Sequence, residues 1–212
     1  MPLVYQQNIN EATKLGIWHI AENEDFFLSN IPLQRTITHP HKRLQHLAGR
    51  FLLKELFPDF PHSMIQIADT RKPFLMDEAY HFSISHCGDF AAAVVSTKNR
   101  VGVDIELYTD KVERVKHKFL SDEEELILHK SNEGNDLPFM QILTAAWSIK
   151  ETIFKWEGKG ELDFKEHMQI SSLEIKNLET ANTFCKLSKD DIVQLNVQVK
   201  FFSQMALAWC VQ

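Results

Sequence analysis

The chain has 212 residues, of which 44% are hydrophobic and 25% charged, and this ordinary globular composition excludes a disordered protein. Its formal net charge of −6 argues against non-specific nucleic-acid binding, because that function needs an excess of basic residues. The three cysteines are odd in number and far apart, so neither a disulfide framework nor a zinc site is expected.

The first third of the chain is predicted to hold short strands followed by one long helix. Apolar runs at residues 3–9 and 14–21 indicate a strand or a strand pair, and residues 22–28 indicate a short helix or a loop. Residues 41–57 form an amphipathic helix that Pro58 ends. Its apolar stripe consists of Leu44, Leu47, Ala48, Phe51 and Leu52.

A second face of this helix is basic. Arg43, His46, Arg50 and Lys54 fall within a narrow arc of the helix, and no acidic residue occurs between Leu33 and Lys54. An anion-binding surface would explain such a basic segment inside an acidic protein. The structural alternative is a solvated helix face.

The middle of the chain is predicted to form an antiparallel meander of three strands joined by tight connections. Its strands are expected at residues 81–86, 90–97 and 101–107. Ser85 and His86 lie at the end of the first strand, beside the turn. Before them, Arg71, Lys72 and Pro73 form a rigid basic turn, because proline fixes its own φ and pushes the preceding residue to extended geometry.

The third of these strands places two acids side by side. Val101, Val103 and Ile105 alternate with polar residues, so Asp104 and Glu106 share the opposite face. Two carboxylates on one strand face repel each other unless a cation or a proton lies between them. A magnesium site is the functional interpretation, since Mg²⁺ prefers oxygen ligands and substrate phosphate. A solvent-facing acidic edge is the alternative.

The second half is predicted to begin with two helices and end in three or four strands between residues 167 and 212. Ser121 and Glu124 form a capping box that opens a helix to about Lys130. A longer helix runs from about residue 138 to 157, where Gly158 stops it. Its predicted buried stripe consists of Ile142, Ala146, Ile149, Ile153 and Trp156.

A second motif lies on this longer helix. Trp147, Glu151 and Lys155 follow one another at i, i+4 and i+8 and therefore share one face. Taken alone, Glu151 and Lys155 would be an ordinary helix salt bridge. The combination of G-x-D-x-E on a strand with W-x-x-K-E-x-x-x-K on a helix about 45 residues later is not expected by chance.

With these motifs the sequence resembles the 4′-phosphopantetheinyl transferases, of the two-subdomain, surfactin-synthetase-activating type. The resemblance covers residues 40 to 165. Its main motifs are VGVDIE at 101–106 and WSIKETIFK at 147–155, supported by KP at 72–73, FSISH at 82–86 and GKG at 158–160.

The resemblance implies an enzyme that transfers phosphopantetheine from coenzyme A to a serine of an apo acyl or peptidyl carrier protein. The second product would be adenosine 3′,5′-bisphosphate. A serine hydroxyl needs a base and a diphosphate leaving group needs neutralising cations, so acids and lysines suit this chemistry.

The resemblance also implies roles for single residues. Asp104, Glu106 and Glu151 would hold Mg²⁺ on the diphosphate, and Glu151 would act as the base, directly or through water. Lys155 would face the phosphates. The residues that match coenzyme A contacts are Lys72, Ser85 and His86, and Arg43, with Arg50 as second choice, substitutes for basic residues that some relatives carry before the first helix.

The resemblance implies an α+β fold of two similar subdomains, residues 1–100 and 101–212, each an antiparallel sheet packed with a long helix and related by pseudo-two-fold symmetry. The active site would lie in the cleft between them. Arg71 stands where relatives commonly carry glycine, so the geometry of that turn is left open. We expect a cytoplasmic monomer without nucleic-acid or membrane partners. Lys111 to Phe119 is the expected surface for docking the carrier protein, and a solvated mobile loop is the alternative for this segment.

Two alternatives remain at this point. One is another Mg²⁺-dependent enzyme acting on a nucleotide pyrophosphate, although the chain lacks the G-x-x-x-x-G-K-[ST] loop of P-loop proteins. The other is a non-catalytic homologue that binds a carrier protein.

Overall fold

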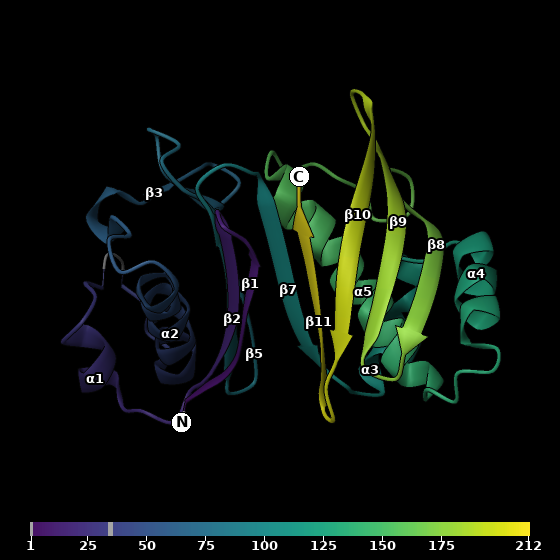
Figure 1. Cartoon of the computed structure of the whole chain (residues 1–212), viewed down its shortest axis with the longest axis horizontal. Helices are drawn as coiled ribbons and strands as arrows, with labels where there is room; N and C mark the ends of the chain where they lie inside the picture. The colour runs from purple at the N-terminus through teal and green to yellow at the C-terminus, as the bar shows by residue number, and fades with distance from the viewer. Residues whose placement is uncertain (1, 34–35) are drawn as a thin grey trace. The chain divides into compact units, whose positions relative to one another are not determined.

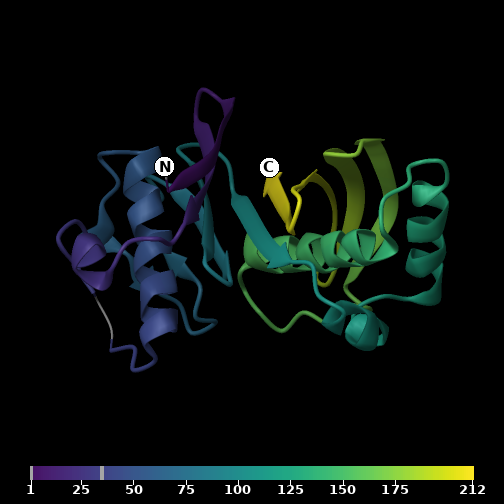
Figure 2. The ribbon, with the colours of Figure 1, turned by 90° about the horizontal axis from the view of Figure 1, so that it is seen from below.

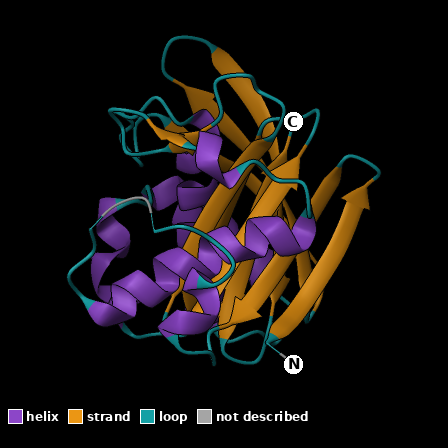
Figure 3. Cartoon of the chain, turned by 90° about the vertical axis from the view of Figure 1, so that its left-hand side faces the viewer, coloured by secondary structure: helices purple, strands orange, loops and turns teal. Residues whose placement is uncertain are grey.

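The computed structural model describes residues 2–33 and 36–212 and shows an α+β chain, with helices purple and strands orange in Figure 3. The chain divides into two compact units, Met1–Val103 and Asp104–Gln212 (Figure 1). Each unit holds a sheet built on antiparallel strand pairs and one long helix. The α+β class expected from the sequence is therefore confirmed.

The first unit is a four-stranded sheet packed with one long helix. Its elements are β1 (Leu3–Asn10), β2 (Thr13–His19), α1 (Glu24–Leu28), α2 (Pro40–Leu56), η1 (His62–Met64), β3 (Gln66–Ile67), β4 (Pro73–Phe74), β5 (His81–Cys87) and β6 (Phe90–Ser96). The sheet has the order β1-β2-β6-β5 with all neighbours antiparallel, and α2 packs on β6, β2 and β5. The predicted strand pair and the predicted helix are both present.

The core of the first unit contains pairs of aromatic rings among its aliphatic side chains. The rings of Trp18 and Phe51 meet edge to face at 5.0 Å, and those of Phe60 and Phe82 meet in the same way at 5.1 Å. Edge-to-face contact is the geometry that aromatic quadrupoles favour, so the first pair fixes α2 against β2 and the second fixes the segment after α2 against β5.

One basic residue of α2 is buried, contrary to the sequence prediction. Arg50 was expected on the basic face, but its side chain is only 4% exposed. Its Nε donates to Nε2 of His46 at 2.9 Å, and its carbonyl oxygen accepts from Nε2 of His62 at 2.7 Å. The bond to His46 satisfies one donor of the buried guanidinium, whereas the bond from His62 reaches the backbone carbonyl of Arg50. Periodicity alone does not reveal that this side chain is buried.

The second unit is a five-stranded sheet with four helical segments. Its elements are β7 (Val101–Leu107), whose first three residues still belong to the first unit, α3 (Lys111–Val115), η2 (Lys116–Lys118), α4 (Asp122–Asn132), α5 (Phe139–Glu157), β8 (Met168–Asn177), β9 (Thr180–Ser188), β10 (Ile192–Phe201) and β11 (Met205–Val211). The sheet has the order β7-β11-β10-β9-β8, and β8 to β11 form an antiparallel meander. Helix α5 lies against β11 and β10 and is seen lengthwise in Figure 2.

Strand β7 is not the third strand of the meander that the sequence predicts. Strands β5 and β6 pair as expected, but β7 lies at the edge of the second sheet, beside β11. The reason is that β2 pairs with β6 along its other side, so β6 offers no open edge to β7. Tight turns predict neighbouring strands, but they do not show which edges are already taken.

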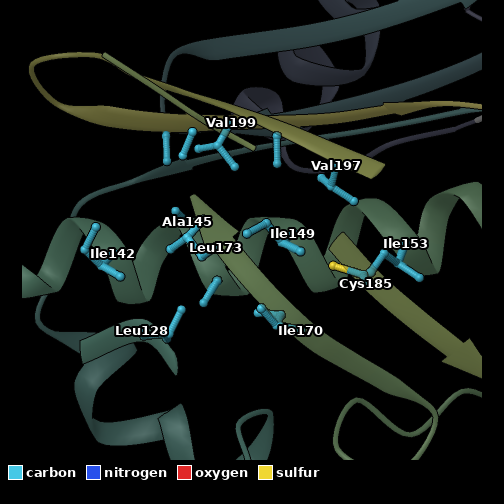
Figure 4. Close-up of a cluster of buried hydrophobic side chains, with 14 of the residues drawn as sticks. Leu128, Ile142, Ala145, Ile149, Ile153, Ile170, Leu173, Cys185, Val197 and Val199 are labelled. Carbon is cyan, nitrogen blue, oxygen red and sulfur yellow. The ribbon is translucent and has the colours of Figure 1, made fainter. Parts of the chain in front are cut away.

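Helix α5 buries the apolar stripe that its sequence predicts. Figure 4 shows Ile142, Ile149 and Ile153 lying among side chains of β8, β9 and β10, including Val197. All five residues of the predicted stripe are buried. The helix ends at Gly158, whose φ of 72° is the left-handed conformation that glycine adopts without strain.

The cysteines are not joined by disulfides. Cys185 and Cys210 are buried in the second unit, and burial raises the pKa of both thiols. Cys87, at the end of β5, is partly exposed.

Among the residues that the structure describes, no helix combines the length and the apolar character needed to cross a bilayer.

The packing of α2 on β5 predicts the effect of a single methyl group. A Cβ at Gly49 would lie 2.5 Å from Cγ2 of Ile84, a β-branched side chain that cannot move away easily. Alanine at a helix position gains about 1 kcal/mol over glycine, whereas overpacking costs about 1–3 kcal/mol. We therefore expect Gly49→Ala to lower the free energy of unfolding by about 1 kcal/mol in urea titration.

The control is Gly49→Ala in an Ile84→Ala background, where the methyl clash is gone and the substitution should stabilise. Stabilisation by Gly49→Ala alone would show that the helix and the sheet are not held at this spacing.

Candidate active site

Strand β7 carries the two acids that the sequence places on one face. Asp104 is buried and Glu106 is half-buried. Nζ of Lys155 donates to Oδ1 of Asp104 at 2.6 Å, which makes a close, largely desolvated ion pair. Charge-assisted hydrogen bonds of this length are stronger than hydrogen bonds between neutral groups, so Lys155 partly neutralises the charge of Asp104 in this structure.

Helix α5 makes a second contact with β7, two helical turns before Lys155. Nε1 of Trp147 donates to Oε1 of Glu106 at 3.3 Å. Trp147, Glu151 and Lys155 lie on one helix face. Of these three, Trp147 binds Glu106 and Lys155 binds Asp104. Glu151 stands between them on the helix.

The environment of Glu151 is electrostatically unusual. Burial and, after it, the charge of Asp104 raise the pKa of Glu151, Lys155 opposes them and Glu106 adds a smaller rise, so that the pKa lies at about 7. A carboxyl group that responds to two other carboxylates lies within their reach, so the three acids form one electrostatic cluster. A carboxyl with a pKa near neutrality is suited to exchange a proton at physiological pH.

The donor set fits a hard divalent cation by its chemistry, since three carboxylates supply the oxygen ligands that Mg²⁺ prefers. As the side chains stand, however, no three acidic, histidine or cysteine residues in the described part of the chain are arranged to hold a metal ion. The ammonium group of Lys155 lies against Asp104 instead. The cluster therefore has the right residues for a metal, with a lysine as the present counter-charge.

Two residues predicted to contact coenzyme A, Ser85 and His86, are consecutive on β5. Their side chains must therefore lie on opposite faces of the sheet. Ser85 is buried and His86 is exposed, in agreement with this alternation. The strand does not present the two side chains on a common surface.

Lys72 follows a hairpin turn between β3 and β4. The turn closes through hydrogen bonds from the amide of Arg71 to Ala68 O at 2.8 Å and from the amide of Ala68 to Lys72 O at 2.9 Å. Arg71 has a φ of 67°, the left-handed conformation that glycine adopts most readily. The turn thus keeps a glycine-like backbone although an arginine occupies the position, and this explains why glycine is suited to it.

Arg43 is bound within the first unit. Its Nε donates to Oε1 of Glu24 at 2.7 Å, a second nitrogen lies 2.7 Å from Oε2, and Nη1 donates to Ile37 O at 2.9 Å. The hydrogen bond and the charge of Glu24 raise the pKa of the Arg43 guanidinium. The carboxylate of Glu24 therefore binds two nitrogens of the Arg43 guanidinium group, which would otherwise be suited to bind a phosphate.

A family model described as the 4′-phosphopantetheinyl transferase superfamily matches residues 100–210, just over half of the chain. The chain belongs to this superfamily. The match includes the strand that carries Asp104 and Glu106 and the helix that carries Glu151 and Lys155. This family membership agrees with the resemblance found in the sequence motifs.

Relatives point to the same family. The chain is 36% identical over 115 residues to enterobactin synthase component D of Salmonella austin and 33% identical over 117 residues to the protein of that name in Escherichia coli. Each match covers 54% of this chain, and 47% and 54% of the two relatives. The chain therefore spans about half the length of these relatives. A Haemophilus influenzae protein with a provisional name as a 4′-phosphopantetheinyl transferase is 28% identical over 132 residues, 58% of this chain and 52% of that protein.

Sequence reasoning missed the partners of three residues, which are Glu106, Arg43 and Lys150. The bond from Trp147 to Glu106 could have been inferred from the helix face that Trp147 shares with Glu151. The pairing of Glu24 with Arg43 carries no comparable signal, because nothing in the spacing of those residues brings them together. Lys150, which belongs to the helix motif, pairs with buried Glu124, which lies outside the motif.

The raised pKa of Glu151 predicts that the stability of the metal-free protein depends on pH. The folded chain holds this proton up to a pH of about 7, whereas an ordinary glutamate carboxyl loses it near 4.5. The folded state therefore binds more protons between these values, and stability falls as the pH rises through them. Since one pKa unit corresponds to about 1.4 kcal/mol, ionised Glu151 costs up to about 3 kcal/mol.

We expect Glu151→Gln to stabilise the protein at pH 8 in the presence of a chelator and to have little effect at pH 4.5, as measured by urea unfolding. Glu123→Gln, on the exposed face of α4, serves as the control and should show no such difference. Equal effects of Glu151→Gln at both pH values would contradict the clustering of the three acids.

Proposed function

We propose that this chain transfers the 4′-phosphopantetheine group of coenzyme A to a serine of an acyl or peptidyl carrier protein and releases adenosine 3′,5′-bisphosphate. The observation that carries the proposal is Glu151, a carboxyl with a pKa near 7, set among Asp104, Glu106 and Lys155. Family membership and similarity to enterobactin synthase component D support it.

In this proposal Glu151 is the base. The serine oxygen attacks the phosphorus that carries the pantetheine arm, the bond from that phosphorus to the bridging oxygen breaks, and the hydroxyl proton passes to Glu151 or to a water that it holds. Lys155 neutralises charge on the departing phosphate oxygen, which requires its ammonium group to turn from Asp104 toward the substrate.

Asp104, Glu106 and Glu151 would hold Mg²⁺, which when bound supplies positive charge to the diphosphate. Neutralisation of these carboxylates by a cation would also remove the repulsion that raises the pKa of Glu151, so the base would be ionised at neutral pH.

Residues of the first unit would bind coenzyme A. We assign Lys72, Ser85 and His86 to its phosphates and Arg43 to its 3′-phosphate. The buried serine and the exposed histidine would contact the ligand from different sides, since β5 presents them on opposite faces.

A cavity beside Glu106 supports docking of the acceptor protein on the segment from Lys111 to Phe119. The cavity measures about 180 Å³ and is lined by Glu106, Leu107, Thr109, Lys111, Val112, Val115, Thr144 and Trp147. An apolar side chain of a protein could enter it next to the acid cluster. Lys116 contributes less basic charge to this surface than the sequence suggests, because it pairs with Glu113 and Glu125.

The activity has a direct test. We expect coenzyme A, Mg²⁺ and an apo carrier protein to give a carrier protein heavier by one phosphopantetheine in mass spectrometry. Glu151→Ala should lower the rate at least about 100-fold, the usual effect of losing a general base, and a chelator should abolish it. Glu123→Gln on exposed α4 should transfer at the rate of the unchanged protein.

The alternatives give different results. Coenzyme A cleavage without any increase in carrier mass would indicate another nucleotide pyrophosphate enzyme, and carrier binding without chemistry would indicate a non-catalytic homologue. Full transfer by Glu151→Ala would remove the proposed base.

The contact between Glu24 and Arg43 predicts how the 3′-phosphate is bound. If Arg43 takes this phosphate, Glu24 competes with it, so Glu24→Gln should tighten coenzyme A binding several-fold. Arg43→Gln should weaken binding about 10-fold, as expected for the loss of a charge-assisted hydrogen bond. Calorimetric titration measures both.

Dephospho-coenzyme A, which lacks the 3′-phosphate, is the matched control ligand and should bind equally to all three proteins. The same effects with both ligands would show that Arg43 only fastens α1 to α2.

A further inference from the structure

The second unit contains a fully buried ion pair outside the acid cluster. The side chain of Lys150 on α5 is 0% exposed and that of Glu124 on α4 is 1% exposed, and Nζ lies 2.6 Å from Oε1. Lys150 immediately precedes Glu151 on the helix, and successive helix positions differ in direction by about 100°. The two side chains therefore leave the helix in different directions, Lys150 into the protein and Glu151 toward the acids of β7.

Every donor of the Lys150 ammonium group has an acceptor. Besides Glu124, Nζ donates to Phe164 O at 2.7 Å and to Met168 O at 2.8 Å. An ammonium group has three protons, so its hydrogen-bonding capacity is complete. These acceptors come from α4, from the segment after α5, and from the start of β8.

Glu124 is equally well satisfied. Its Oε1 also accepts from the amide of Ile170 at 2.8 Å, and its Oε2 accepts from the amide of Ser121 at 2.9 Å in the capping box. One lysine and one glutamate thus join α4, α5, β8 and the loop before β8 in one network.

The segment after α5 is fixed to the helix by its side chain as well. The ring of Phe164 stacks on Trp147 at 5.4 Å and on Phe154 at 5.8 Å, one turn on each side of Lys150. The backbone oxygen of Phe164 accepts from Lys150 between these two contacts. The stretch of α5 that carries Glu151 is therefore held at three successive turns.

Stability alone does not explain such a pair. Apolar residues of similar volume stabilise a core as well as a buried ion pair or better, because desolvation offsets the attraction between the charges. The pair instead fixes the orientation of the helix. Hydrogen bonds restrict rotation and sliding of a helix, whereas apolar contacts do so only weakly.

We propose that Lys150 and Glu124 are positioning residues, whose buried contact fixes the turn of α5 that carries Glu151 and so places its carboxylate for proton transfer. The inference rests on the proposed function, because it gives the pair a role in that reaction. A displacement of about 1 Å at a catalytic group can cost about 100-fold in rate.

The test compares a variant without the ion pair with a variant that is only less stable. Lys150→Met/Glu124→Gln removes both charges with little change of volume and leaves no unpaired buried charge. Ile149→Val, on the same turn, removes one buried methyl group without touching a polar contact. Both are assayed well below the Tm of the weaker one.

We expect the double variant to lose about 10- to 100-fold in kcat while its KM for coenzyme A and for the carrier protein changes less than about threefold. Ile149→Val should keep kcat within about threefold. Equal kcat in the two variants, or a loss confined to KM, would overturn the positioning role. If the double variant does not fold, the single variant Glu124→Gln takes its place, because Lys150 keeps both of its carbonyl acceptors in that variant. It must then show the same loss of kcat with little change in KM.

Amide hydrogen exchange separates this inference from the proposed function. If the unchanged protein transfers no phosphopantetheine, the proposed function fails, and the positioning role is judged on exchange alone. The amide of Ile170 and the helix turn from Lys150 to Lys155 should then exchange faster in the double variant than in Ile149→Val. Unchanged protection would show that the pair does not hold the helix.

Discussion

The crowding of negative charge between β7 and α5 is the constraint on which the second unit depends. Asp104 and Glu106 come from the strand and Glu151 from the helix, and the raised pKa of Glu151 reports their repulsion. A cluster of this kind opposes folding in the absence of a cation. The surrounding structure must therefore hold the helix in place by other contacts.

Helix α5 provides those contacts on its other faces. Its apolar stripe, including Ile149 and Ile153, is buried in the core of the unit. Lys150 fastens a neighbouring face, so the helix is held by residues other than those that carry the acids. This division lets one helix combine a stable core with a cluster of carboxylates that repel one another, and catalytic sites commonly reduce stability in this way.

The sequence was informative where structure is local. Periodicity found α5 and its buried stripe, and the Ser121–Glu124 capping box marked the start of α4. The alternation at Asp104 and Glu106 and the helix spacing of Glu151 and Lys155 indicated which residues to examine. What remained hidden depends on contacts distant in the chain. Examples are the place of β7 in the second sheet and the burial of Arg50, because a pattern on one element does not show what lies across from it.

The burial of two of the three cysteines has a practical consequence. Thiolates, not thiols, react with electrophiles, and Cys185 and Cys210 are kept protonated inside the core. A maleimide dye should therefore label the native chain at one place, Cys87, without any engineered substitution. Cys87 follows Ser85 and His86 on β5, so its fluorescence would report directly on whatever ligand reaches that strand end.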